Sequence, residues 1–189
     1  MKTLFLDTAT ASLVIGLLNK DQEYLMIKDA LRDHSTNTVE DIKEFLSQHQ
    51  VRIKDIDNIV VGIGPGSYTG IRVAVMVAKM LASTLKIKLY KISSITFLTS
   101  GLAKTLGFIE LKNMAGFLSL NHYGQQLSTD TYKSLEELNT KQYQDKLLIQ
   151  KESIKISLVN SLKNAKLVKD IHSLVPNYAR ITQAEGQLL

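Results

Sequence analysis

The sequence predicts an α/β protein, and three features of residues 1–100 indicate this fold class. Short apolar runs of strand length alternate with stretches whose apolar residues recur at helical spacing, in the order β-β-β-α-β-α-β-α. The run from Asp57 to Ile63 is nearly continuous in isoleucine and valine, as is typical of a strand buried on both faces. A glycine-rich turn joins this strand to a long apolar helix. We therefore expect a sheet with parallel strands that is covered by helices.

Three strands in a meander are predicted at the start of the chain. Their apolar centres are Thr3–Leu6, Leu13–Leu18 and Tyr24–Ile27, and polar turn residues separate them. A helix should follow and end near His49, with its N-cap supplied within His34–Thr36. The apolar residues that recur at helical spacing in it are Val39, Ile42, Phe45 and Leu46.

The helix predicted from Gly70 to Leu85 is unusual because it is apolar on nearly every side. Only Arg72 and Lys79 are charged, whereas a surface helix normally keeps a polar face. Two interpretations stay open: a core helix between the sheet and a neighbour within the chain, or a helix that packs against a second protein. A membrane span is not expected of about 16 residues with two internal cations. Small side chains form a ridge that another helix could approach closely. The ridge consists of Gly70, Ala74, Ala78 and Ala82.

The remaining elements are predicted from weaker patterns. A strand at Leu89–Ile92 leads into a helix that is capped by Ser93 or Ser94 and extends to about Leu106. Regular patterns become fainter beyond Gly107. The segments expected there are strands at Phe117–Leu120, Gln126–Thr129 and Leu147–Gln150, and helical or extended pieces at Ser157–Lys163 and Ser173–Arg180.

Composition and charge narrow the class of protein. With 189 residues, 44% of them apolar, the chain can bury one substantial core or two small ones. The absence of cysteine excludes a disulfide framework and any thiolate nucleophile or metal ligand. The opening MKTLFLDT fits a first strand better than a secretion signal, so we expect a cytoplasmic protein. The net charge of +5 is spread along the chain. Direct RNA binding by the chain alone is therefore not expected, whereas a basic helper within a larger RNA-acting complex stays open.

The glycine-rich turn, Gly62–Gly70, does not match a known phosphate-binding motif. Its glycines miss the G-x-G-x-x-G spacing, and no lysine follows as in a P-loop. Pro65 has no N–H to offer to a phosphate, and Ser67 lacks the flanking glycines of a nucleophile elbow. We expect a shaped turn, and the helix N-terminus after it could bind an anion only weakly.

Few polar groups could carry chemistry. Asp7, Thr8 and Thr10 follow the first strand, where a carboxylate and two hydroxyls could lie near a phosphate or a hydrated cation. A turn in which these side chains bond to their own backbone is the simpler interpretation. The four histidines include no pair at helical spacing, so no metal site is predicted. No local spacing ties a serine, a histidine and an acid into a triad, and we nominate no catalytic residue.

Four segments give the chain a family resemblance. They are Asp7–Thr10 after the first strand, His34-Ser35 before the first helix, the block Gly64–Arg72 (GPGSYTGIR) and Pro176–Arg180 (PNYAR). Together they resemble the TsaB/YeaZ family, and the glycine block is the most specific of them. The likeness covers the first half of the chain well. It is poor in the second half, where Asn121-His122-Tyr123 stands in place of the family's aspartate-alanine-arginine.

The resemblance implies an actin-like ATPase fold, of the ASKHA and RNase H-like class, with two lobes. Residues 1–104 would form the first lobe, which carries the partner interface. Residues 105–189 would form a shortened, divergent second lobe, whose C-terminal tail packs back on the first. Members of this family are non-catalytic partners of TsaD in the bacterial complex that makes N6-threonylcarbamoyladenosine next to the tRNA anticodon. TsaD holds the metal and performs the transfer, and TsaE supplies an ATPase.

The resemblance thus implies a TsaD-like catalytic subunit and a TsaE-like ATPase as partners, with tRNA reached only through the complex and no membrane. It implies no cofactor, with ATP or ADP only at the complex interface. A homodimer of the chain when it is alone stays open, because a hydrophobic face can pair with itself when the partner is absent. The alternative is a small ATP-binding phosphotransferase or ATPase that uses Asp7, aided by Thr8 and Thr10, at the phosphates. The partner interface is expected on the two helices of the first lobe. Its residues would be Val39, Ile42, Tyr68, Thr69, Gly70, Arg72, Val73, Ala74, Met76, Val77, Ala78, Met80 and Leu81.

Overall fold

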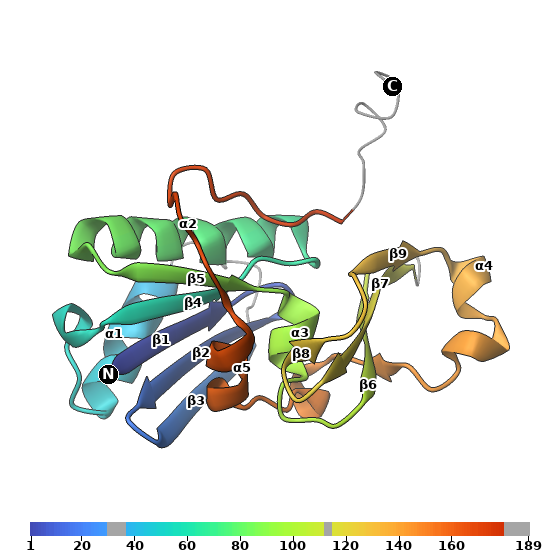
Figure 1. Ribbon diagram of the computed structural model, residues 1–189, viewed down its shortest axis with the longest axis horizontal. Helices are drawn as coiled ribbons and strands as arrows, with labels where there is room; N and C mark the ends of the chain where they lie inside the picture. Colours follow the sequence, from blue (N-terminus) through green and yellow to red (C-terminus); the bar gives the residue numbers. More distant parts are fainter. Residues whose placement is uncertain (30–36, 112–114, 180–189) are drawn as a thin grey trace.

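Two β-sheets lie side by side in the molecule, and helices cover both faces of the first (Figure 1). The computed structural model describes residues 1–29, 37–111 and 115–179. The first sheet is built from the N-terminal part of the chain plus one short strand from the C-terminal region. The α/β class predicted from the sequence is therefore confirmed.

The first sheet has six strands, of which the central ones are parallel. β1 pairs antiparallel with β2 and parallel with β4, and β4 pairs parallel with β5. Every residue of β4 is buried, which explains its unbroken run of isoleucine and valine. In sheet order the strands are β11 (Lys166–Leu167), β5 (Lys88–Ile92), β4 (Asn58–Gly62), β1 (Lys2–Asp7), β2 (Ser12–Asn19) and β3 (Gln22–Asp29).

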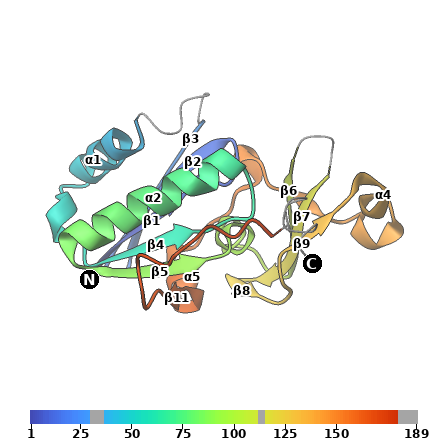
Figure 2. The same ribbon diagram turned by 90° about the horizontal axis from the view of Figure 1, so that it is seen from above.

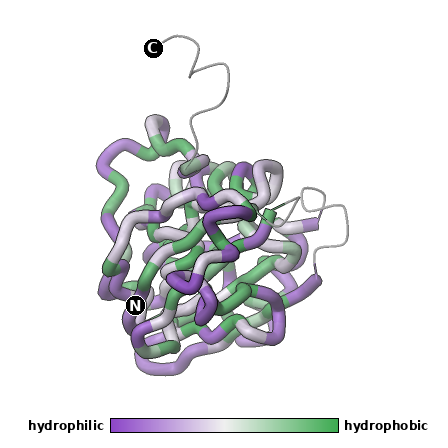
Figure 3. The backbone as a smooth tube through the Cα atoms, turned by 90° about the vertical axis from the view of Figure 1, so that its right-hand side faces the viewer, coloured by the Kyte–Doolittle hydropathy of each residue, from purple (hydrophilic) through white to green (hydrophobic). Residues whose placement is uncertain are grey.

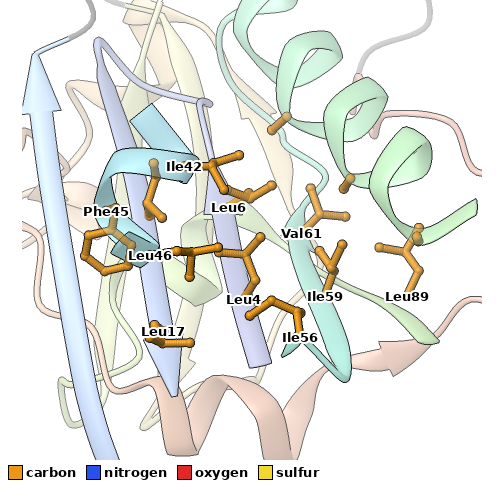
Figure 4. Close-up of a cluster of buried hydrophobic side chains, with 14 of the residues drawn as sticks. Leu4, Leu6, Leu17, Ile42, Phe45, Leu46, Ile56, Ile59, Val61 and Leu89 are labelled. Atoms are coloured by element: carbon orange, nitrogen blue, oxygen red, sulfur yellow. The ribbon is translucent and has the colours of Figure 1, made fainter. Parts of the chain in front are cut away.

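Helices α1 (Thr38–Gln48) and α2 (Tyr68–Leu85) lie next to each other on one face of this sheet (Figure 2). The close-up in Figure 4 shows α1 side chains packed with Leu4 and Leu6 of β1. Phe5 points to the other face, because successive strand residues alternate. There it joins a second cluster that contains residues of α3 (Ser94–Leu98) and α5 (Leu158–Asn164).

The second sheet is smaller and lies beyond α3. Its path is β10-β6-β7-β8, and β9 also pairs with β7. Figure 3 views the molecule from this side and shows that hydrophobic and hydrophilic residues are interspersed along the backbone. The strands are β6 (Thr105–Glu110), β7 (Gly116–His122), β8 (Gln125–Gln126), β9 (Thr131–Lys133) and β10 (Leu147–Leu148); the short helical elements are α4 (Leu135–Leu138), η1 (Ile53–Asp55), η3 (Lys141–Tyr143) and η4 (Lys151–Ser153).

Polar contacts connect the second sheet to α3 and connect α5 to the first sheet. The Thr96 hydroxyl of α3 donates a 2.6 Å hydrogen bond to the Asn121 side chain of β7, and both residues are buried. The Glu23 carboxylate of β3 accepts hydrogen bonds from the N–H groups of Leu158 and Val159 at the start of α5. A carboxylate at this position accepts hydrogen bonds from N–H groups that have no partner within the helix, and its negative charge interacts favourably with the helix dipole. The two lobes are thus joined by specific bonds as well as by apolar packing.

Several sequence predictions of element bounds are wrong or incomplete. α3 ends at Leu98 instead of near Leu106, because the Gly101 N–H bonds to Lys155 and the chain then enters β6. The strands β6 and β11 were not predicted, and the stretch from Leu174 to Ala179 is neither helix nor strand. α1 begins at Thr38, so its N-cap is Asn37. The predicted caps His34, Ser35 and Thr36 lie outside the described residues, as does Arg180.

The glycine and alanine ridge of α2 faces the chain's own sheet. Gly70 is buried, and Ala74, Ala78 and Ala82 are 0 to 1% exposed. The ridge belongs to the cluster that α1 and the strands share. The opposite side of the helix is open, with Met76 71% exposed. The prediction that this ridge meets a partner is therefore wrong, because the sheet already occupies it.

α2 has the length and hydropathy of a membrane-crossing helix among the described residues. One face of it is nevertheless packed on the sheet, with buried side chains such as Ile71 and Val75. Core helices of soluble proteins meet the same criteria. Burial of one face in the core therefore explains part of the apolar composition of α2. The apolar side chains on the exposed face need a separate explanation.

The two faces of α2 can be separated by a matched pair of acidic substitutions. We expect Ala78→Asp to destabilise the fold by more than about 4 kcal/mol, because a carboxylate would be buried without a partner. Met76→Glu, two residues away on the open face, should change the free energy of unfolding by less than about 0.5 kcal/mol. Urea unfolding followed by circular dichroism measures both. Equal stability of the two variants would contradict the assigned orientation.

Candidate partner interface on helix α2

The open face of α2 carries the largest exposed apolar side chains of the helix. Met76 is 71% exposed, Tyr68 56% and Met80 48%. Val73 and Val77 lie beside them and are half-buried. Single exposed apolar residues are ordinary, whereas several gathered on one helix face indicate an interaction site. We call Tyr68, Val73, Met76, Val77 and Met80 the α2 face.

A segment from the C-terminal region lies along one side of the α2 face (Figures 1 and 2). We call this segment, His172–Ala179, the strap. The Lys79 ammonium donates to the backbone carbonyls of His172 and Leu174, at 2.8 and 2.9 Å. Farther along, the Asn177 N–H donates to the Ile63 carbonyl at 2.7 Å. The lysine that seemed an isolated charge on an apolar helix therefore holds the strap in place.

An arginine between two tyrosines makes the second attachment of the strap. The Arg72 guanidinium donates a 2.9 Å hydrogen bond to the Tyr178 hydroxyl and a second one to the Tyr68 hydroxyl. It also lies 4.0 Å from the centroid of the Tyr68 ring, a cation–π distance. The two tyrosine rings are 5.2 Å apart. The cluster joins the first turn of α2 to the end of the strap and places an aromatic surface beside the α2 face.

Between α2 and the strap lies an open groove of about 570 Å³. Apolar side chains form most of its surface, and Val175 of the strap is 68% exposed at its edge. An apolar groove bordered by a few polar groups is the usual form of a surface that takes a partner's side chain. The residues that line it are Arg72, Val75, Met76, Lys79, Met80, Ser83, His172, Leu174, Val175, Pro176 and Tyr178.

The structure divides the predicted interface residues into two groups. Gly70, Ala74 and Ala78 of α2 and Ile42 of α1 are buried in the core, so they are not available to a partner. Val39 of α1 is 37% exposed, but its exposed neighbours are polar. The remaining predicted residues of α2 reach the surface: Tyr68, Thr69, Arg72, Val73, Met76, Val77, Met80 and Leu81.

Sequence reasoning missed the strap as part of this surface. Pro176 and Tyr178 belong to the PNYAR segment that contributed to the family resemblance, but no interface role was predicted for them. The contact between Arg72 and Tyr178 spans 106 positions of sequence. An unpaired arginine and lysine on an otherwise apolar helix were the available indications that something polar lies beside it.

The glycine-rich turn has the structural role that the sequence predicts. The Ser67 hydroxyl caps α2 by accepting from the Gly70 N–H, and the Gly70 carbonyl accepts from the Thr8 hydroxyl at 2.5 Å. A side chain at Gly70 would collide with the Thr8 carbonyl, since its Cβ would lie 1.9 Å from that oxygen. The turn therefore locks the start of α2 against the end of β1.

Asp7 is buried in the same region, at the end of β1. It is 0% exposed, its Oδ1 accepts from the Ala9 N–H at 2.8 Å, and its Oδ2 has no hydrogen-bond partner. Burial raises the pKa of Asp7 to about 6, although the neighbouring Ser94 hydroxyl and the Ala9 N–H oppose this rise. Gly62 is required beside it, because a Cβ there would lie 1.7 Å from Oδ2.

The proposed phosphate site at Asp7, Thr8 and Thr10 is not favoured by this geometry. Thr8 is 1% exposed and bonded to Gly70, and the Thr10 hydroxyl accepts from the Ser12 N–H. A buried carboxylate with a raised pKa would also repel a phosphate when it ionises. Asp7 and Thr10 instead accept hydrogen bonds from nearby backbone N–H groups, as the simpler interpretation predicted, and Thr8 bonds to α2.

Asp7 should make stability depend on pH. The pKa of its carboxyl is about 6 in the folded state, above the value of 3.8 expected when the chain is unfolded. The folded state therefore loses stability as pH rises from about 4 to 6, and the full penalty of about 3 kcal/mol persists above pH 6. We expect Asp7→Asn to be more stable than the parent at pH 7 but not at pH 4. Urea unfolding at both pH values measures this, and a parent advantage at pH 7 would contradict it.

The strap should loosen when its two cationic attachments are removed. In the Arg72→Ala and Lys79→Ala double variant, the backbone N–H of Asn177 should exchange with deuterium at least about tenfold faster, because opening of the strap becomes easier. Hydrogen exchange with mass spectrometry measures this. Peptides from α1 serve as the internal control and should keep their rates. Unchanged exchange at 172–179 would show that Arg72 and Lys79 do not hold the strap.

Comparisons with known proteins find similarity to proteins of tRNA threonylcarbamoyladenosine biosynthesis. The model of the family described as TsaD, tRNA N6-adenosine threonylcarbamoyltransferase, matches residues 28–105. The tRNA threonylcarbamoyladenosine biosynthesis protein TsaB of Bacillus subtilis (strain 168) is 35% identical over 103 residues, which are 53% of this chain and 44% of that protein. TsaB of Escherichia coli (strain K12) is 26% identical over 101 residues, again 53% of this chain and 44% of that protein. The chain thus spans less than half the length of these two relatives.

Solved structures extend the likeness to the second lobe. YeaZ from Pseudomonas aeruginosa matches with a TM-score of 0.64 at 21% identity, covering 69% of this chain and 66% of that chain. A protein described as similar to peptidase YEAZ from the same organism matches with a TM-score of 0.77 at 18% identity, covering 95% of this chain and 99% of that chain. These matches show the fold, and the predicted two-lobed, actin-like fold is confirmed.

Proposed function

We propose that this chain, which is similar to TsaB proteins, takes part in the biosynthesis of threonylcarbamoyladenosine in tRNA as a non-catalytic subunit. In this proposal it binds a TsaD-like threonylcarbamoyltransferase through the α2 face. The observation that carries the proposal is the row of exposed apolar side chains on α2, led by Met76 and Met80. A TsaE-like ATPase would join the same complex, and tRNA would be reached through it.

The chemistry of the α2 face supports a protein partner. Burying a methionine side chain that is exposed in the free protein contributes about 1.5 to 3 kcal/mol. Methionine also adapts its shape to a partner because it is unbranched and has several rotatable bonds. Tyr68 and Arg72 at the edge of the face are residue types enriched where interfaces are strongest. A standard interface buries about 800 Å² on each side, so the strap and its groove would belong to it.

The family match suggests what kind of surface the partner presents. Residues 28–105 contain α1 and α2, and they match a model named for TsaD itself. A TsaD-like protein would therefore have a lobe of similar shape, with helices at the corresponding positions. Two such lobes can pair through equivalent helices about an approximate two-fold axis, as like surfaces do in symmetric dimers. This chain would also self-associate through the α2 face, but more weakly than it binds the TsaD-like protein.

An accessory role also agrees with the side chains that the site offers. The α2 face contains no general acid or base, and the groove beside it holds one histidine, His172. Stabilising the active arrangement of a catalytic partner requires only a specific, well-packed contact. ATP or ADP, where it is needed, would bind at the interface of the complex.

The proposal is tested by charged substitutions on the α2 face. We expect the Met76→Glu and Met80→Glu double variant to weaken co-purification with the TsaD-like protein of the same cell at least about a hundredfold, because two carboxylates would be buried in the interface. Affinity pull-down of the tagged chain followed by mass spectrometry measures the captured partner.

The control for this experiment is Leu135→Glu on α4. Leu135 is 41% exposed, so it is an apolar surface residue of similar exposure far from the α2 face. This variant should capture the TsaD-like partner as well as the parent chain does. Undiminished capture by the α2 double variant, with its fold intact by circular dichroism, would contradict the proposed interface.

A further inference from the structure

Two lysines that are far apart in the sequence meet at one edge of the first sheet. Lys91 lies on β5, and Lys166 lies on β11, which forms the outer margin beside β5 (Figure 2). A charge count along the chain does not reveal this pair, because the fold brings two distant segments together. We call Lys91 and Lys166 the lysine edge.

The strand register places like charges opposite each other. β11 pairs antiparallel with β5 so that Lys166 is the direct partner of Lys91. The Val168 N–H bonds to the Leu89 carbonyl and continues this register. Like charges in directly opposed positions destabilise a sheet. None of the ion pairs among the described residues involves a lysine of this edge.

Protection of an exposed sheet edge does not account for this arrangement. Lysines on an edge strand prevent unwanted pairing with another chain, and Lys166 on β11 could serve in that way. Lys91, however, lies on β5, where it pairs with Lys166 of β11 on one side and with Val61 of β4 on the other. Charges on an inner strand add repulsion and protect no edge. A ligand with negative charge would convert the repulsion into attraction.

A polar cavity opens beside the Lys91 and Lys166 pair. Its volume is about 360 Å³, and both lysines line it together with the amide side chains of Gln126, Asn164 and Asn177. Asp130 also lines it, where the carboxylate accepts from Ser93, Gln126 and Asn177. Such walls offer hydrogen-bond donors and acceptors to a neutral polar group. Cations at the rim and amides inside suit a nucleotide, whose phosphate is charged and whose ribose and base are not.

We propose that the lysine edge binds the phosphate backbone of RNA, with the adjoining cavity taking a ribose or base. The choice of RNA over another polyanion rests on the proposed function, in which the complex acts on tRNA. Neither Lys91 nor Lys166 lines the groove beside the α2 face, and the cavity shares only Asn177 with the strap. Lysine ammonium groups contact phosphates without regard to sequence, so this surface would position RNA and not select its bases.

The test measures RNA binding by the full chain alone. A fluorescently labelled RNA stem-loop is titrated with the parent chain and with the K91Q/K166Q variant, at several salt concentrations, and anisotropy gives the affinity. We expect the variant to bind at least about tenfold more weakly at low salt, and the slope of log affinity against log salt to fall by about 1 to 2. The matched control is K54Q/K141Q, which removes two exposed lysines elsewhere with the same change of net charge.

Each result decides the proposal. A selective loss in K91Q/K166Q supports it, and an equal loss in K54Q/K141Q, or no binding by the parent chain, overturns it. Competition by polyglutamate as strong as by unlabelled RNA would assign the edge to an acidic protein, and competition by AMP at equal nucleotide concentration would assign it to free nucleotides. Either of these outcomes overturns the RNA proposal. We expect the M76E/M80E variant to bind RNA like the parent. A failure of the RNA proposal can therefore be distinguished from a failure of the proposed partner interface.

Discussion

The close packing of the small-residue ridge of α2 against the first sheet is the contact on which the rest of the structure depends. Because Ala74, Ala78 and Ala82 have almost no side chain, the helix lies near the strands, and its start is fixed by the bond between Thr8 and Gly70. With this face occupied, the larger apolar residues of the helix are turned outward. The orientation of one ridge thus determines which side chains a partner can reach.

The strap depends on the same orientation. Arg72 and Lys79 leave the helix at its side, where they attach a distant segment to it. Without that segment Lys79 would lose both of its hydrogen-bond acceptors, and Arg72 would keep only Tyr68. With it, the helix gains a second wall, and the exposed methionines lie beside a groove instead of on an isolated ridge. This surface therefore combines residues of α2 with residues of the C-terminal region.

Much of the first lobe could be predicted from local pattern. The unbroken apolar run of β4, the serine that caps α2 and the turn residues between the first strands are decided by neighbours in sequence. The orientation of α2 could not be predicted in this way, since two of its faces are apolar and only tertiary packing distinguishes them. The same holds for Lys91 and Lys166, which only strand register brings together. The length of α3 was overestimated because the bond from Gly101 to Lys155 is a long-range contact.

The central claim is that the outward face of α2 meets the catalytic partner, and photo-crosslinking tests it most directly. A benzophenone amino acid would replace Met76 in one version of the chain and Lys43, on the exposed side of α1, in another. After irradiation with the TsaD-like protein, we expect a covalent complex from position 76 in high yield, with the crosslinked peptide in the partner's corresponding helix. Absence of crosslinks from position 76, together with efficient crosslinking from position 43, would contradict the account.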